Sequence, residues 1–449
     1  MRSVIVMGAG GRDFHDFNVV YRDDPDVEVV AFTAAQIPGI ADRLYPPSLA
    51  GPRYPDGIRI VPEERLAELV RAEGVDEVVL AYSDLSHEEA MHKASIALAA
   101  GASFSLLGPN ATMLDCAKPV VAVCAVRTGS GKSQTSRRVG QILLDAGLRV
   151  ALVRHPMPYH DLEAMRVQRF ATIDDIDASR PTIEEREEYE RPVELGMVVY
   201  AGVDYAAVLE QAQAEADVIV WDGGNNDFPF VRPDLLIVVV DPLRAGHELR
   251  YHPGETNLRM ADVVVVNKLD SADPEAAERV LADVAALNPS ATVVRAASPV
   301  TLDPGPPLLN ASVVVVEDGP TITHGGMPFG AGTVAARAAR VGMRVDPRPY
   351  AVGSIAETFA HYPHIGPVLP AMGYSEEQVA ELEQTLNAID CDAVIAGTPV
   401  DLGRLIACRH PIRRAAYELQ ELGEPDIRAV LATLVEEARA GSVPAGADR

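Results

Sequence analysis

Short apolar runs alternate with amphipathic segments along most of the chain. Most of the runs are rich in β-branched residues and have the length of buried parallel strands. Strands are predicted at 3–7, 27–32, 77–81, 104–106, 120–126, 149–153, 217–221, 235–240, 263–266, 292–296, 312–316 and 393–396. Helical spacing of apolar residues is found at 62–73, 86–100, from about 334 onward, and at 375–388. Strands that alternate with helices predict an α/β protein with parallel sheets.

The fifth of these runs ends in a glycine turn. Residues 120–126 lead into T-G-S-G-K-S, and a helical pattern follows. Glycines in such a turn let consecutive backbone N–H groups face a phosphate at a helix N-terminus. We expect Lys132 at the β- and γ-phosphates and the Ser133 hydroxyl at Mg²⁺, although Val126 replaces the first glycine of the full consensus. The nucleotide-binding residues predicted in this turn are Thr128, Gly129, Ser130, Gly131, Lys132, Ser133 and Gln134.

A second metal ligand is expected at the end of the strand at 217–221. Asp222 follows this apolar run directly, and two glycines come after it. A carboxylate that ends a buried strand beside a phosphate loop is typical of the Mg²⁺ sites of nucleotide-hydrolysing proteins. Ser133 and Asp222 are therefore the predicted metal ligands.

Base recognition is predicted in two further loops. Asn267, Lys268 and Asp270 form N-K-L-D after the run at 263–266. This element reads guanine in many GTPases, and ATP-using proteins of the same class carry similar sequences. Pro399, just after the strand at 393–396, is also placed against the base. ATP is the expected nucleotide, and GTP is the alternative.

The predicted fold has three parts. Residues 1–117 form an N-terminal Rossmann-like parallel sheet, residues 118–345 a P-loop NTPase α/β core, and residues 346–449 a C-terminal extension that packs on the core. The first glycine-rich loop, G-A-G-G-R, lacks the G-x-G-x-x-G spacing of dinucleotide-binding sites. A phosphate or carboxylate ligand at its turn, around Gly11 and Arg12, is the favoured interpretation, and a structural turn is the alternative.

Two other loops carry candidate substrate-binding groups. The segment R-H-P-M-P-Y follows the strand at 149–153, at the sheet edge where open α/β proteins bind ligands. The segment 241–257 is unusually dense in histidine, glutamate and arginine for its length. The predicted substrate-binding residues are Gly11, Arg12, His15, Tyr159, Arg250 and His252.

Two segments have more than one interpretation. The acidic stretch 172–192 is mainly expected to be a solvated helix face, with Glu184 or Glu188 as candidates to close over the site. The glycine-rich stretch 323–333 has the composition of an anion-binding loop, and flexibility alone explains it equally well.

Composition excludes several classes of partner. The net charge of −26 and a pI near 4.8 argue against nucleic acid and anionic membranes. No run reaches the roughly 18 apolar residues of a membrane span, so a cytoplasmic location is expected. The four cysteines show no C-x-x-C spacing.

The chain has only four lysines and 35 arginines, and two of the four lysines, Lys132 and Lys268, lie in nucleotide-type motifs. This scarcity strengthens both assignments, because a guanidinium does not replace a compact ammonium in a phosphate loop.

Several motifs together resemble the cyclic 2,3-diphosphoglycerate synthetase family. They are G-A-G-G-R-D-F-H-D-F-N, T-G-S-G-K-S-Q-T-S-R, V-R-H-P-M-P-Y, Y-A-G-V-D-Y, W-D-G-G-N-N-D, G-H-E, Y-H-P-G-E-T-N and N-K-L-D. The resemblance implies an N-terminal Rossmann-like domain and a core of the class that includes dethiobiotin synthetase and the nickel-insertion GTPases. It also implies ATP- and Mg²⁺-dependent closure of 2,3-diphosphoglycerate into an intramolecular phosphoanhydride.

In that reaction one substrate phosphate would attack the γ-phosphorus of ATP, and the second substrate phosphate would then attack the phosphorylated group and expel phosphate. Such chemistry depends on positioning and charge neutralisation. The predicted catalytic residues are Lys132, Asp222, Arg154, His155, His247 and Glu248. The expected partner is a small phosphorylated molecule, and the expected assembly is a homodimer. The alternative function is a regulatory or metal-delivery GTPase, although Cys124 lacks the accompanying Cys/His cluster that metal delivery needs.

Overall fold

The chain folds around three mainly parallel sheets. The structure is a computed structural model that describes residues 1–34, 40–157, 161–224, 227–323, 325–373 and 375–442, with the Glu184 side chain also outside the description. Tyr159 therefore lies outside the described residues. The predicted α/β class is confirmed, because strands from all three sheets alternate with helices along the sequence.

The N-terminal sheet has the strand order β3-β4-β2-β1-β5-β7. All its strands are parallel except β3, and the order of the parallel strands is that of the first five strands of a Rossmann fold. Apolar side chains from both faces of the sheet form two buried clusters. The elements are β1 (Arg2–Met7), α1 (Arg12–Asp16), β2 (Val27–Ala34), β3 (Leu44–Tyr45), α2 (Pro47–Ala50), β4 (Ile58–Pro62), α3 (Leu66–Glu73), β5 (Glu77–Leu80), α4 (His87–Ala100), β7 (Ser103–Ser105) and α5 (Pro109–Thr112).

The central sheet has the order β10-β11-β9-β12-β8-β13-β15-β16-β23. Its inner strands are parallel and nearly all apolar, as expected for strands covered by helices on both faces. The strands are β8 (Val120–Ala125), β9 (Val150–Arg154), β10 (Gln168–Phe170), β11 (Val198–Ala201), β12 (Val218–Asp222), β13 (Leu235–Val240), β15 (Val263–Val266), β16 (Thr292–Ala297) and β23 (Gln420–Glu421). The helices are α6 (Lys132–Asp145), α7 (Ile173–Ser179), α8 (Ile183–Glu194), α9 (Tyr205–Glu215), α10 (Gly254–Met260), α11 (Pro274–Leu287) and α17 (Ile427–Ser442).

The third sheet has the order β17-β22-β21-β18-β19, and β20 also pairs with β18. Its strands are β17 (Val300–Leu302), β18 (Ser312–Asp318), β19 (Met343–Arg344), β20 (Leu369–Ala371), β21 (Ala393–Gly397) and β22 (Ile412–Tyr417). Its helices are α12 (Gly319–Ile322), α13 (Ala331–Ala338), α14 (Gly353–His361), α15 (Glu376–Ala388) and α16 (Leu402–Leu405). The predicted boundary after residue 345 cuts through this sheet, because β18 and β19 lie before it and β21 and β22 after it.

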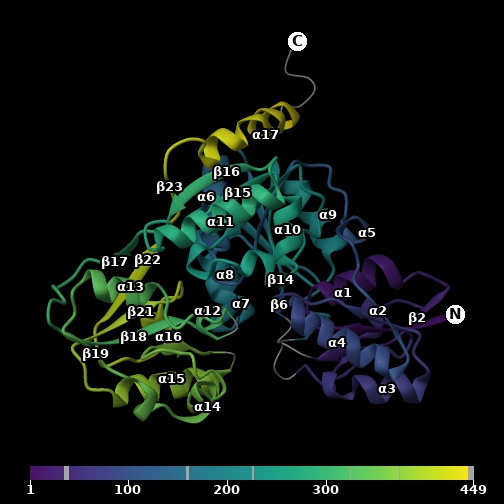
Figure 1. Ribbon diagram of the computed structural model, residues 1–449, viewed down its shortest axis with the longest axis horizontal. Helices are drawn as coiled ribbons and strands as arrows, with labels where there is room; N and C mark the ends of the chain where they lie inside the picture. The colour runs from purple at the N-terminus through teal and green to yellow at the C-terminus, as the bar shows by residue number, and fades with distance from the viewer. Residues whose placement is uncertain (35–39, 158–160, 225–226, 324, 374, 443–449) are drawn as a thin grey trace.

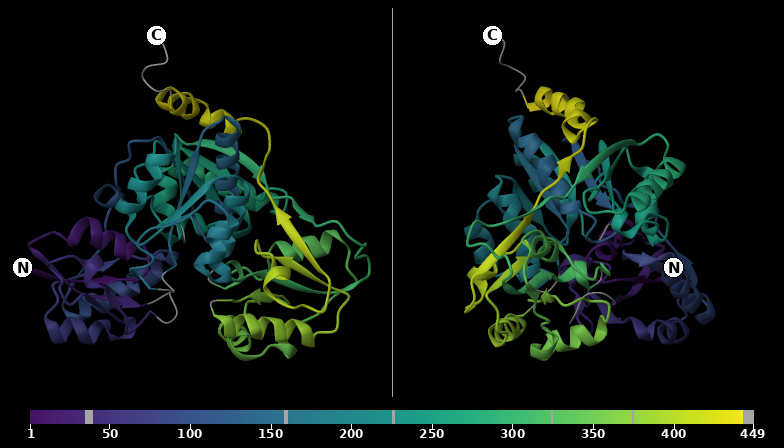
Figure 2. Two further views of the ribbon diagram at one scale, coloured as in Figure 1. Left: turned by 180° about the vertical axis from the view of Figure 1, so that it is seen from behind. Right: turned by 60° about the vertical axis from the view of Figure 1, so that its left-hand side comes forward.

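The N-terminal sheet and the third sheet lie on opposite sides of the central one (Figure 1). The C-terminal segment then returns from the third sheet to the central one, where β23 pairs with β16 and α17 packs (Figure 2). A small sheet of β6 (Leu85–Ser86) and β14 (Tyr251–His252) joins the N-terminal part to the core.

In the part of the chain that the structure describes, no helix has the length and apolar character needed to cross a membrane. The homodimer and the cytoplasmic location stay predictions.

Candidate active site

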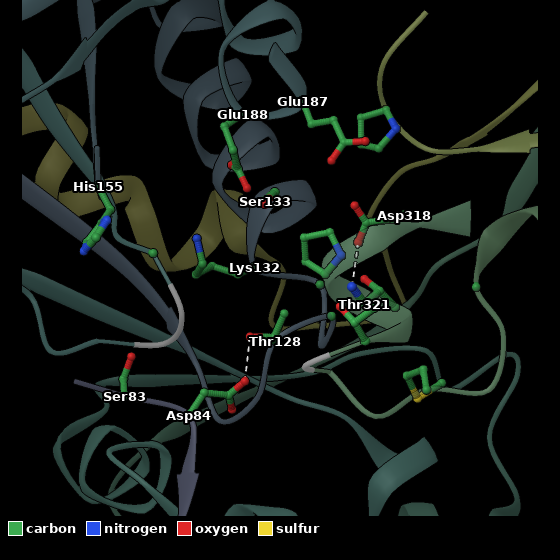
Figure 3. Close-up of a pocket in the computed structure, with 18 of the residues that line it drawn as sticks. Ser83, Asp84, Thr128, Lys132, Ser133, His155, Glu187, Glu188, Asp318 and Thr321 are labelled. Carbon is green, nitrogen blue, oxygen red and sulfur yellow. Dashed lines mark hydrogen bonds between the residues drawn. The ribbon is translucent and has the colours of Figure 1, made fainter. Parts of the chain in front are cut away.

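A cavity of about 870 Å³ is lined by residues from all three sheets. Its walls come from the loops at the carboxyl ends of parallel strands, among them β1, β5, β8, β9 and β12. Open α/β sheets bind ligands at this edge, because the loops there are free to diverge from the regular strands. In Figure 3, Lys132 lies near the middle, with His155 on one side and Asp318 and Thr321 of the third sheet on the other.

The glycine turn lies between β8 and α6, as predicted. α6 begins at Lys132, and both Gly129 and Gly131 have positive φ angles of 79° and 117°. Only glycine adopts such angles readily. Val126 stands at the position of the first consensus glycine. Gly254 packs against its backbone, because a Cβ at Gly254 would lie 2.9 Å from the Val126 Cα. The turn therefore keeps the tight backbone path that a phosphate loop needs.

The Lys132 ammonium forms an ion pair with Asp222, at the carboxyl end of β12. Asp222 also pairs with Arg154, and Arg154 pairs in turn with Glu188 of α8. Burial acts to raise the pKa of Asp222, but Arg154 and Lys132 hold it below its usual range. Burial lowers the pKa of Lys132, and Asp222 opposes that shift. These groups form one buried chain of alternating charges at the predicted γ-phosphate position.

The Ser133 hydroxyl and the Asp222 carboxylate are oxygen donors of the kind that Mg²⁺ prefers; both Asp222 oxygens are hydrogen-bonded, to Lys132 and Arg154, so a metal ion would have to share this carboxylate with them. Mg²⁺ prefers oxygen ligands and commonly takes one or two from the protein, with phosphate and water oxygens completing its shell. Ser133 lines the cavity beside Lys132 (Figure 3). Among the described residues there is no group of three or more His, Cys, Asp or Glu that could hold a metal ion. The donor set therefore suits Mg²⁺ brought with a nucleotide.

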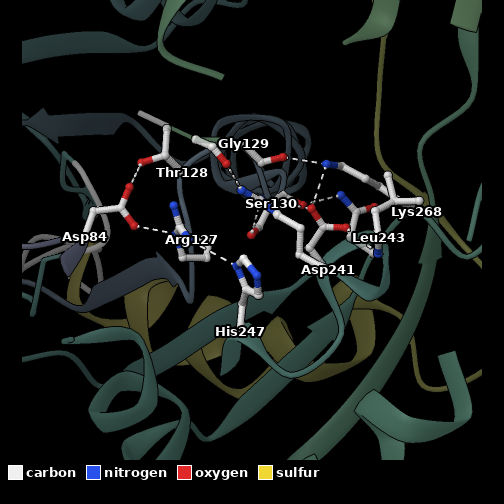
Figure 4. A network of polar contacts seen from close by, with 12 residues as sticks. Asp84, Arg127, Thr128, Gly129, Ser130, Asp241, Leu243, His247 and Lys268 are labelled. Atoms are coloured by element: carbon white, nitrogen blue, oxygen red, sulfur yellow. Dashed lines mark hydrogen bonds and ion pairs between the residues drawn. The ribbon is translucent and has the colours of Figure 1, made fainter. Parts of the chain in front are cut away.

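Two residues of the N-K-L-D segment hydrogen-bond the backbone of the glycine turn. Asn267 Nδ2 donates to the Ser130 carbonyl at 2.9 Å, and Lys268 Nζ donates to the Gly129 carbonyl at 2.5 Å. Lys268 also pairs with Asp241 at 3.0 Å (Figure 4). These contacts fix the backbone of the turn.

The position of Asp270 does not support the base-reading role predicted for it. Asp270 is exposed and does not line the cavity, and its Oδ1 accepts from the Ser298 backbone N–H at 3.0 Å. Lys268, Gln134 and Pro399 do line the cavity, close to the third sheet. The Ser298 hydroxyl donates to Gln134 Oε1 at 3.1 Å, which ties the same loop to the glycine turn.

An aspartate of the N-terminal part reaches the glycine turn, and the sequence analysis missed it. Asp84 follows β5 and accepts from Thr128 Oγ1 at 2.8 Å and from Arg127 Nε at 2.7 Å (Figure 4). Its φ angle of 64° is unusual for a residue other than glycine. The signal was available, because Ser83 and Asp84 closely follow the strand predicted at 77–81, at the ligand-binding edge of the first sheet. The nucleotide turn is thereby joined to the N-terminal sheet.

The first glycine-rich loop does not offer its N–H groups to a ligand. Asp13 Oδ1 accepts from the backbone N–H of Gly10 at 2.6 Å, Gly11 at 3.1 Å and Phe14 at 2.7 Å. The anion predicted at this turn is thus supplied by the chain itself. Burial raises the pKa of Asp13 to about 6 against the effect of these hydrogen bonds. Gly11 and Arg12 line the cavity, as expected.

His155 is wedged between two glycines. A Cβ at Gly11 would overlap the imidazole at Nε2, and a Cβ at Gly224 would lie 2.9 Å from the His155 Cβ. Nδ1 lies 2.7 Å from the Pro156 carbonyl, and Nε2 lies 3.8 Å from Asp227 Oδ2. Burial, with Arg154 and Lys132 adding to it, lowers the pKa of His155 to about 4. The ring is therefore neutral at physiological pH.

Besides Ser130, Asp222, Asn267 and Asp270, five predicted residues do not line the cavity, and their surroundings explain why. His15 is 1% exposed, hydrogen-bonds the Thr112 carbonyl at 2.6 Å and stacks on Phe230. His247 contacts Arg127 below the glycine turn (Figure 4), and buried Glu248 accepts from the Gly246 N–H at 2.9 Å. The other two lie in the same loop and are Arg250, which is exposed, and His252, which belongs to β14. The substrate and catalytic roles predicted for these five are therefore corrected to structural or surface positions.

The glycine-rich stretch 323–333 is also satisfied internally. Glu317 is fully buried and accepts from the backbone N–H groups of Gly332 at 2.8 Å and Thr333 at 2.7 Å. An internal carboxylate therefore occupies the start of α13, where an external anion was one interpretation. From the acidic stretch, Glu187 and Glu188 line the cavity, so part of α8 is more than a solvated face.

The fold and the glycine turn define a P-loop nucleotide-binding protein. Residues 209–295, from α9 to β16, match the family model described as "CobW/HypB/UreG, nucleotide-binding domain". The chain is 57% identical over 430 residues to the arginine synthetase ArcE of Thermococcus kodakarensis, and the match covers 96% of each chain. The protein therefore belongs to the family of this arginine synthetase.

Solved structures give weaker matches. An "apo" form of LpxK from Aquifex aeolicus in complex with ATP is 13% identical, with a TM-score of 0.39, over 73% of this chain and 90% of that one. The hydrogenase maturation factor HypB from Archaeoglobus fulgidus is 16% identical, with a TM-score of 0.27, over 52% of this chain and 89% of that one.

Proposed function

We propose that this protein is an ATP- and Mg²⁺-dependent synthetase that activates a small substrate by phosphoryl transfer and forms arginine as its product. One observation carries the proposal. A single cavity runs from the glycine turn at Lys132 to the first loop of the N-terminal sheet at Arg12. Its volume of about 870 Å³ suits a nucleotide and a small metabolite side by side.

Arginine is proposed from the name of the Thermococcus relative. A synthetase that forms arginine couples one of its C–N bonds to nucleotide cleavage. The guanidino C–N bond is the natural candidate, because it forms from a ureido group and ammonia with loss of one oxygen. The ureido oxygen of citrulline attacks the γ-phosphorus and releases ADP. Ammonia then attacks the ureido carbon, inorganic phosphate leaves with that oxygen, and the nitrogen gives up a proton.

The chain's own residues support both steps by position and charge. Lys132 and Arg154 lie where charge develops on the transferred phosphoryl group, and Asp222 keeps both side chains in place. Mg²⁺, held by Ser133 and Asp222, would neutralise charge on the nucleotide phosphates. Neutral His155 lies on the opposite side of Lys132 from the third sheet and can accept a proton at Nε2 (Figure 3).

Closure of 2,3-diphosphoglycerate is the second candidate, and the motifs quoted above favour it. It uses the same two steps, with phosphate groups as both nucleophiles. The charges on the cavity wall favour the first candidate. Seven carboxylates and six cations line the cavity, and Lys132 and Arg154 are already paired with Asp222. A bisphosphate beside a triphosphate needs an excess of cations, whereas an amino acid substrate does not.

A GTPase function is the remaining alternative, and it depends on guanine recognition. Asp270 is exposed and outside the cavity, which supports ATP. The test is phosphate release by the purified chain with ATP or GTP, combined with citrulline and ammonium, with 2,3-diphosphoglycerate, or with no addition. Release that requires ATP, citrulline and ammonium supports the proposal. Release that requires 2,3-diphosphoglycerate supports the second candidate, and GTP-only release that no metabolite changes supports the GTPase.

A further inference from the structure

Two hydrogen-bond acceptors face each other at the N-terminal end of the cavity. His155 Nδ1 lies 2.7 Å from the Pro156 carbonyl, which can only accept, so the ring proton is on Nδ1. Nε2 is then an acceptor, and it lies 3.8 Å from Asp227 Oδ2. This distance is too long for a direct hydrogen bond. Both side chains line the cavity, so the pair suits a donor with several hydrogens.

Asp227 has acceptor capacity to spare. It is 4% exposed, and its Oδ1 has no hydrogen-bond partner among the described residues. Burial raises its pKa to about 7, while Arg12 and a hydrogen bond with the Ser83 side chain act in the opposite direction. A buried carboxylate gains most from a charged donor, because an unpaired buried charge is costly.

The Arg12 guanidinium lies on the same wall and has unused donors. Arg12 is 2% exposed and lines the cavity, yet its Nη1 and Nε have no hydrogen-bond partner in the described part of the chain. Nη2 donates to the Leu107 carbonyl at 3.2 Å, Nε lies 3.7 Å from Asp16 Oδ2, and the guanidinium lies 4.2 Å from the centre of the Phe228 ring. A ligand carboxylate would satisfy the free donors.

Chain connectivity keeps these groups together. Arg12 follows Gly11, which packs directly on His155 Nε2, and Phe228 under the guanidinium follows Asp227. A cation with free donors and a pair of acceptors thus occupy one corner, between the first loop of the N-terminal sheet and the loop after β12. Lys132 lines the same cavity as these groups, and His155 lies to one side of it (Figure 3).

We propose that this corner binds the backbone of an α-amino acid, with the carboxylate on Arg12 and the ammonium between Asp227 and His155. The inference rests on the proposed synthetase function and adds the substrate class and the residues that recognise it. The amino acid side chain then points toward Lys132, where the phosphoryl group is transferred. Asp227 lies close enough to Arg12, Asp13 and Asp16 to feel their charges, so the corner already holds more carboxylates than cations; an α-amino acid backbone adds no net charge to it, whereas a bisphosphate adds several negative charges.

The test compares L-arginine with two analogues, each of which lacks one of its charged groups. L-Arginine carries both groups, agmatine lacks the carboxylate, and 5-guanidinopentanoate lacks the ammonium. Calorimetric titration of the full chain is expected to show L-arginine binding about tenfold tighter than either analogue, or more. Arg12→Gln should remove the preference for L-arginine over agmatine. Asp227→Asn should remove the preference for L-arginine over 5-guanidinopentanoate.

Matched controls separate recognition from folding. Arg232→Gln removes an exposed arginine outside the cavity and should leave all three affinities unchanged. Urea unfolding and Mg-ATP affinity report on the integrity of each variant, and Arg12→Lys, which retains the charge, replaces Arg12→Gln if that variant does not fold. Equal weakening of all three ligands, no preference in the unmodified protein, or tighter binding of 2,3-diphosphoglycerate overturns the inference.

The proposed function is tested separately on the same preparations. Phosphate release with ATP, citrulline and ammonium that occurs without the analogue pattern overturns the amino acid corner alone. The analogue pattern without such release overturns the synthetase function alone.

Discussion

The imidazole of His155 occupies the space that a side chain at Gly11 would need. A Cβ built on Gly11 would overlap Nε2, so the first loop of the N-terminal sheet and the loop after β9 touch directly. The contact brings the predicted substrate side of the cavity against the nucleotide side. It also gives a steric reason for glycine at this position.

Gly11→Ala should therefore displace His155 and impair substrate use. A displacement of about 1 Å at a reacting centre lowers rates by as much as about a hundredfold. We expect a loss of at least about tenfold in kcat/KM for the non-nucleotide substrate, with Mg-ATP affinity little changed. Steady-state kinetics and calorimetry check both values. Gly108→Ala is the matched control, because nothing lies within 4 Å of a Cβ there. Equal effects from the two substitutions would contradict this account.

Lys132→Ala should abolish turnover while the chain stays folded. The ammonium is the compact cation of the glycine turn, and its loss leaves Asp222 paired with Arg154. We expect kcat to fall by on the order of a hundredfold or more. Lys118→Ala, at a lysine outside the cavity, should retain activity. Circular dichroism and urea unfolding check the fold, and a variant that unfolds would assign Lys132 a structural role instead.

His15 provides a stability prediction with a defined sign. Burial, with contributions from Arg12 and His155, lowers its pKa to about 4, and the Thr112 hydrogen bond opposes the shift. Below pH 6.5 the unfolded chain binds a proton at this residue that the folded chain does not bind until about pH 4, so acid destabilises the native state. Relative to His15→Gln, the unmodified protein should lose up to about 2 kcal/mol of unfolding free energy between pH 7 and pH 5. Urea denaturation at both pH values measures the difference, and a pH-independent difference would argue against the shifted pKa.

Glu317 should stabilise the third sheet and its helix α13. Its carboxylate accepts from two backbone N–H groups in a fully buried position. Glu317→Gln turns one of these acceptors into a donor, and we expect a loss of about 1–3 kcal/mol in unfolding free energy. Glu357→Gln, at an exposed glutamate of α14, should cost much less. Similar losses for both variants would show that the buried cap does not matter.

The strands and the nucleotide turn were predictable from local pattern. β13 and β15 have the predicted bounds, the glycine turn lies between β8 and α6, and Asp222 is the last residue of β12. A continuous apolar run is enough to locate such a strand, because buried parallel strands are apolar on both faces.

The other half of the site was not predictable in the same way. Asp84 and Asp227 act through contacts with loops that are distant in sequence, and no local spacing records such contacts. The polar loop at 241–257 was misassigned for a related reason. Its density of charged groups serves internal contacts such as His247 with Arg127, which composition alone does not distinguish from ligand binding.

The most direct test of the account follows one oxygen atom. Citrulline labelled with ¹⁸O in the ureido group is incubated with ATP, Mg²⁺, ammonium and the purified protein, and phosphate and arginine are analysed by mass spectrometry. Transfer of the label to inorganic phosphate, with one arginine formed per phosphate, is the predicted result. Phosphate that carries no label, or phosphate released without arginine, would contradict the proposal that a substrate oxygen is phosphorylated and then displaced.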